Sequence, residues 1–166
     1  MKDGVTVTQD NMKAVADAVE LLSKSRVLVG IPSANAGRNE DATSQPITNA
    51  ALGYIHEYGA PEQNIPARPF LNPGVDGSKK QWLPYLEAAG RNALNGESGK
   101  VTQNLDNAGL TAQNAVRAFI TAGDTFAPLA PVTLAARQRK GRTGTKPLID
   151  TNQMLKSVTY VVRKDS

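Results

Sequence analysis

The sequence predicts an α+β fold in which a small, mainly antiparallel sheet of about three or four strands packs against helices. Short runs rich in β-branched residues lie near the start, in the middle and at the end of the chain, and segments with apolar residues at helical spacing separate them. The 166 residues are 40% apolar and 20% charged, which is typical of a globular protein. This length favours a single domain over residues 1–166, with long polar loops near 33–46 and 137–146.

The first part of the chain is expected to hold two strands around one helix. Val5–Thr8 alternates in the manner of a short strand, and apolar residues from Met12 to Leu22 predict a helix of about 12 residues. The dense apolar run at 26–31 predicts a core strand that ends at Pro32, because proline cannot donate to a ladder. The polar residues 33–46 then predict a flexible loop, either a partner-binding arm or plain disorder.

Three helices and one stiff segment are expected in the middle of the chain. Thr48 can cap a short helix that ends before Gly59. Two prolines within 65–71 exclude a central strand there and predict an extended, rigid segment. Apolar spacing then predicts a third helix around residues 82–93 and a fourth around 105–120.

The C-terminal part of the chain is strongly basic. Residues 131–166 contain 8 Lys and Arg against 2 Asp and Glu, whereas residues 1–130 contain 11 against 13. Pro131 can open one helical turn that ends near residue 137. After the loop near 137–146, the pattern predicts a turn of helix at 152–156 and a strand at 157–162. The loop carries five cations, Arg137, Arg139, Lys140, Arg142 and Lys146.

This basic loop leaves three interpretations open. It can contact phosphates, as in a small basic nucleic-acid-binding protein, it can meet an acidic protein surface, or it can be merely solvated. No aromatic residue interleaves the cations, which disfavours recognition of single strands by base stacking.

The composition excludes several classes of protein. The chain has no cysteine and one histidine, His56, so disulfides and zinc or copper centres are not expected. No apolar stretch approaches the roughly 20 residues that cross a bilayer, so the chain is expected to be soluble and without a membrane partner. Nothing pairs Glu57, Glu62 or Asp150 for acid–base chemistry, so neither an enzyme nor a cofactor is expected. A hydrolase with Glu57 as its base is the weakest alternative.

The stiff segment presents an arginine between two prolines. Phe70 can anchor this segment in the core, and Arg68 presents a forked cation that suits a carboxylate. The candidate partners are Glu57, Glu62 or an acidic residue of a neighbouring subunit. We therefore expect Arg68 and the corner formed by His56 and Glu57 to make a polar lock, either within one chain or between subunits.

Two segments are similar to a known family. The first runs from Val29-Gly30-Ile31-Pro32 through 51–60 (ALGYIHEYGA) to 65–71 (IPARPFL), and the second joins 146–151 (KPLIDT) to 154–158 (MLKSV). They resemble the tail-completion, or neck, proteins of long-tailed bacteriophages, also described as virion morphogenesis proteins. Asn152 replaces the family's usual glycine, but asparagine also tolerates left-handed backbone. Asp150 or Thr151 is expected to cap the turn that follows.

The resemblance implies a structural virion protein. Family members form a ring, commonly of six subunits, at the head-proximal end of the tail and join it to the head connector. The implied partners are other copies of the chain, the tail terminator or tail tube protein, connector or adaptor proteins, and genomic DNA passing through the channel. The implied location is the virion neck, after synthesis and assembly in the host cytoplasm. We expect residues 33–46 and 137–146 to carry the contacts between subunits and with the tail or connector.

Overall fold

The computed structural model describes residues 12–32 and 47–165. The expected strand at Val5–Thr8 and the expected loop at 33–46 lie outside these residues. The described chain is built mainly of helices, with two strands far apart in the sequence. In chain order the elements are α1 (Met12–Ser23), β1 (Ser25–Gly30), α2 (Asn49–Tyr58), the 3-10 helix η2 (Pro61–Gln63), α3 (Leu71–Gly77), α4 (Lys79–Leu94), α5 (Ser98–Ala122), α6 (Pro131–Arg139), α7 (Gln153–Ser157) and β2 (Thr159–Lys164).

The sheet is a two-stranded antiparallel ribbon. β1 pairs with β2 so that Val27 lies opposite Val162 and Val29 opposite Tyr160. The class α+β is therefore confirmed, but the expectation of three or four strands is wrong for residues 12–32 and 47–165. Helices rather than further strands cover the ribbon: α5 packs along both strands, and these four side chains lie half-buried on that side.

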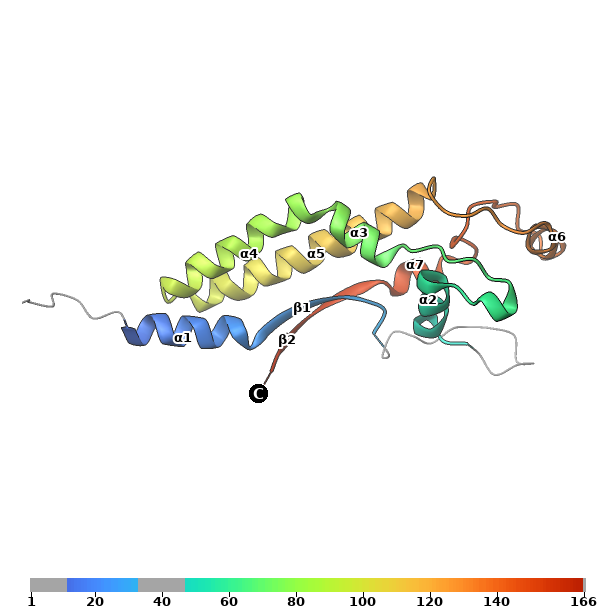
Figure 1. The fold of residues 1–166 in the computed structure, drawn as a ribbon. Helices are drawn as coiled ribbons and strands as arrows, with labels where there is room; N and C mark the ends of the chain where they lie inside the picture. The colour runs from blue at the N-terminus through green and yellow to red at the C-terminus, as the bar shows by residue number, and fades with distance from the viewer. Residues whose placement is uncertain (1–11, 33–46, 166) are drawn as a thin grey trace, which may run out of the picture.

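The long helices form the body of the molecule. α4 and α5 run side by side in opposite directions, with α5 between α4 and the ribbon (Figure 1). These are the two helices expected around 82–93 and 105–120, and both are longer than the apolar spacing alone indicated. α1 packs against α4 at one end of the molecule, whereas α2, α6 and α7 gather at the other.

Two apolar clusters fill the space between these elements. One joins α1, α4 and α5 through small and aliphatic side chains, among them Ala18, Ala89 and Leu105. The other lies at the end that carries α2 and α7, and it includes Phe70 and Val116. Phe70 is 2% exposed, so it anchors the stiff segment in the core as the sequence indicated. The second cluster therefore fixes the framework around the cleft described below.

A glycine allows α5 to lie directly on the ribbon. A Cβ atom added at Gly109 would lie 2.3 Å from the ring of Tyr160, a distance that real contacts do not reach. The glycine lowers the helix propensity of α5, but it lets the backbone approach the tyrosine ring. Close contact between α5 and β2 in turn places the C-terminal strand beside the second cluster.

Candidate functional site: a basic cleft between α2 and α6

A cleft of about 390 Å³ opens at the end of the molecule that carries α2, α6 and α7. Its walls come from α2 and the segment that follows it, from α6, and from residues 148–154. We call it the basic cleft. Six of the nine candidate residues from the sequence line it, namely His56, Arg68, Arg137, Lys140, Arg142 and Asp150. Glu57 and Phe70 are buried outside its lining, and Arg139 is exposed outside it.

Glu57 holds the start of α3. One carboxylate oxygen accepts hydrogen bonds from the backbone N–H groups of Phe70 and Leu71 at 2.7 and 2.8 Å, and the other accepts from Asn72 at 3.0 Å. The next residue, Pro73, has no N–H group. The backbone N–H groups at the start of a helix normally lack a partner within the helix, and in α3 all of them are therefore satisfied by Glu57. The negative charge also lies at the positive end of the helix dipole.

Arg68 does not pair with Glu57, so this part of the expected polar lock is wrong. Its Nε and Nη2 atoms donate instead to the carbonyl oxygens of Ala127 and Pro128, at 2.7 and 2.8 Å. Burial lowers the pKa of Arg68, but a guanidinium remains protonated in proteins. Arg68 therefore joins the stiff segment to the chain that leads into α6, and so it helps to set the width of the basic cleft.

The stiff segment is also tied to α2 through the backbone. Ala60 and Ile65 exchange two hydrogen bonds across the turn that contains η2, and the N–H group of Arg68 donates to the carbonyl oxygen of His56 at 2.6 Å. Gly59 ends α2 with φ of 79°, and a Cβ atom there would lie 2.9 Å from the nitrogen of Ala67. Glycine thus meets two requirements at this corner, left-handed backbone and close approach.

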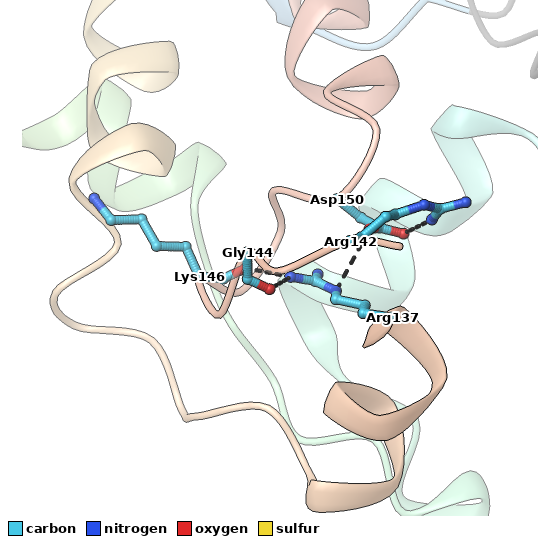
Figure 2. A network of polar contacts seen from close by, with 5 residues as sticks. All are labelled: Arg137, Arg142, Gly144, Lys146 and Asp150. Carbon is cyan, nitrogen blue, oxygen red and sulfur yellow. Dashed lines mark hydrogen bonds and ion pairs between the residues drawn. The ribbon is translucent and has the colours of Figure 1, made fainter. Parts of the chain in front are cut away.

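Arg137 is the centre of the polar contacts on the α6 side (Figure 2). Its Nη1 atom donates to the carbonyl oxygens of Gly144 and Lys146 at 2.8 and 3.0 Å, and its Nε atom lies 3.5 Å from the Asp150 carboxylate. The side chain is 9% exposed. Arg137 was expected in a solvent-facing loop, but α6 extends to Arg139 and turns this guanidinium inward.

Two further cations of the expected basic loop, Lys146 and Arg142, also have partners within the chain. Lys146 points away from Arg137 (Figure 2) and donates to the carbonyl oxygens of Thr121 and Ala122 at the C-terminal end of α5. Arg142 pairs with the carboxylate of Asp150. Asp150 therefore does not cap α7: the residue before that helix is Asn152, with φ of 59° and no side-chain cap. The left-handed backbone expected to be tolerated at this asparagine is present.

The basic cleft combines excess positive charge with aliphatic walls. Its lining contains four cations, Arg68, Arg137, Lys140 and Arg142. Among the described residues of the lining, Asp150 is the one carboxylate. Neither phenylalanine, tyrosine nor tryptophan belongs to that described lining. The arrangement suits an anionic group with an apolar neighbour, whereas a nucleobase would find only the His56 imidazole as an aromatic ring in the described lining. Apart from Pro131, no residue pattern indicated the wall formed by Leu129, Ala130, Thr133 and Ala136.

Comparison of the chain with protein-family models, with curated proteins and with solved structures found no match. Within the described ranges, no three His, Cys, Asp or Glu side chains are grouped so that they could hold a metal ion. In the same ranges, no helix has both the length and the apolar character needed to cross a membrane.

Arg137→Gln is expected to lower the free energy of unfolding by about 2–3 kcal/mol, because two part-buried hydrogen bonds to carbonyl oxygens and an ion pair with Asp150 lose their charged donor. Urea denaturation of the variant and of the wild type measures this difference. Arg139→Gln is the matched control: Arg139 is exposed, and its substitution is expected to change stability by less than about 0.5 kcal/mol. Equal effects of the two substitutions would contradict the role given to Arg137.

Proposed function

We propose that this protein is a structural subunit of the neck of a tailed bacteriophage, where a ring of identical chains completes the tail and joins it to the head connector. The resemblance of two segments to tail-completion proteins motivates the proposal. The role assigns the chain neither substrate turnover nor a cofactor. Its partners are other copies of itself, tail terminator or tail tube protein, and connector or adaptor proteins, with DNA passing through the ring.

One observation carries the proposal. The two segments that resemble the family are separated by about 75 residues, yet both line the same cleft. The first contributes Leu52, His56 and Arg68, and the second contributes Leu148 and Asp150. α2 and α7 also pack against each other. If the family resemblance reflects a shared functional surface, the two motif segments are expected to meet at one place on the protein, as they do at this cleft.

The alternative of a small nucleic-acid-binding protein is less well supported by the site. Affinity for phosphates depends on cations that solvent and ligand can reach. Arg137 and Lys146 are engaged with carbonyl oxygens, and Arg142 is paired with Asp150. Arg139 and Lys140 are exposed. Only two of the five cations of the basic region are thus exposed and outside these contacts, which is few for a surface that binds a phosphate backbone.

Conditional loss of the protein during infection tests the proposal. In cells infected with the phage that encodes the chain, blocking its synthesis is expected to leave DNA-filled heads and separate tails, and supplying it from a plasmid is expected to restore joined particles. Electron microscopy of the lysates measures both outcomes. Normal joined particles in the absence of the protein would overturn the proposal.

A further inference from the structure

The basic cleft carries positive charge that the chain does not neutralise. Arg137 and Arg142 share the carboxylate of Asp150. Arg68 donates to two carbonyl oxygens, and Lys140 forms no ion pair within residues 12–32 and 47–165. Positive charge in a concave site with low-dielectric walls attracts an anion more strongly than the same charge spread over an open surface.

The size and the walls of the cleft indicate which kind of anion it suits. Its volume of about 390 Å³ falls in the range of about 300–1,000 Å³ that is usual for ligand sites. Leu52, Leu129, Leu148 and Met154 line it together with the cations. A free phosphate ion would use the cations alone. A carboxylate side chain with an apolar neighbour would use the cations and also bury the aliphatic wall.

We infer that the basic cleft binds an acidic segment of a partner polypeptide. A glutamate or aspartate of that segment lies beside Lys140 and Arg142, and a neighbouring apolar side chain lies on the aliphatic wall. The chain's own Asp150, a residue of the lining, shows that guanidinium groups of this cleft contact a carboxylate, because it pairs with both Arg137 and Arg142 (Figure 2). The inference goes beyond the neck proposal, since it concerns the isolated chain and holds whether or not that chain forms a ring.

Two neighbouring cations, Arg139 and Lys140, allow binding inside the cleft to be distinguished from a general attraction between opposite charges. Arg139 and Lys140 are both exposed at the end of α6, but only Lys140 lines the cleft. A ligand held by diffuse charge, including duplex DNA, would lose about the same affinity from removal of either cation. A ligand inside the cleft would depend on Lys140 and barely on Arg139.

The experiment is a nuclear magnetic resonance titration of the full chain with methyl-labelled leucine and methionine. The probe is a hexapeptide of alternating glutamate and leucine with both ends blocked, and its glutamine counterpart is the control ligand. We expect saturable shifts at Leu52, Leu148 and Met154, and at least tenfold weaker binding of the glutamine peptide. Lys140→Gln is expected to weaken binding at least threefold, and Arg139→Gln less than twofold.

Three results would overturn the inference. The first is the absence of peptide-dependent shifts at the cleft methyls, and the second is equal weakening by the two substitutions. The third is displacement of the peptide by a short DNA duplex that shifts the same methyls and shows the same dependence on Lys140, which would assign the cleft to nucleic acid. Unchanged methyl spectra away from the cleft establish that both variants are folded. Failure here would leave the infection experiment unaffected, so the two proposals stand or fall separately.

Discussion

Glu57→Ala is expected to lower the free energy of unfolding by about 3–5 kcal/mol, one of the two largest effects of a single substitution that the structure indicates. The carboxylate accepts three backbone N–H groups at the start of α3, and Glu57 is 6% exposed. Removing it leaves those donors in a site that solvent reaches poorly. Chemical denaturation followed by circular dichroism measures the loss.

Two further glutamate variants make this prediction specific. Glu57→Gln keeps the shape but offers one acceptor oxygen and an NH₂ group that would face backbone donors, so a loss of about 2 kcal/mol is expected. Glu62 is exposed in η2, and Glu62→Gln is expected to change stability by less than about 0.5 kcal/mol. If Glu57→Gln were as stable as the wild type, the capping role of the carboxylate would be wrong.

Phe70→Ala is the second substitution with a large expected effect, a loss of about 3–5 kcal/mol. The ring is 2% exposed and belongs to the cluster that also contains Val116, Ile120 and Met154. Truncation removes buried apolar surface and leaves a cavity where the stiff segment meets the core. Thermal or urea unfolding of the purified variant measures the change.

The control for Phe70 is an exposed aromatic residue on the neighbouring helix. Tyr54 is 67% exposed and contacts the ring of Tyr58 at a centroid distance of 4.8 Å. Tyr54→Ala is therefore expected to cost about 1 kcal/mol or less, chiefly the loss of that ring contact. A Phe70→Ala protein as stable as the Tyr54→Ala protein would show that the stiff segment is not anchored in the core.

Local signals in the sequence were sufficient for much of the fold. Apolar spacing identified the two long helices, and the β-branched runs identified both strands of the ribbon, although the C-terminal strand is displaced to 159–164. Thr48 accepts from the N–H group of Ala51, and Gly59 ends α2, as the residue types indicated. Each of these features depends on neighbours within a few residues, which a sequence pattern records directly.

The polar contacts could not be predicted in the same way. Glu57 contacts Phe70 at the start of α3 although the two residues are 13 positions apart. The turn between Ala60 and Ile65 reverses the chain direction and brings them together. The partners of Arg68 lie about 60 residues away and are carbonyl oxygens, which any residue supplies. Composition likewise identified the basic region but not the inward direction of Arg137.

Three charged side chains tie separate segments together at this end of the molecule. Glu57 fixes the helix that follows the stiff segment, Arg68 fixes the chain that leads into α6, and Arg137 folds the loop after α6 onto Asp150. Arg68 and Arg137 thus join the segments that wall the basic cleft, while Lys140 lines it and remains exposed. A positively charged cleft is the surface that the proposed neck subunit would offer to another protein.

Electron cryomicroscopy of intact phage particles would locate this chain. We expect its density as a closed ring of identical copies between head and tail, with the basic cleft of each copy in contact with a neighbouring protein. A map that places the polypeptide elsewhere in the particle, or a mature particle that lacks it altogether, would overturn the proposed neck role.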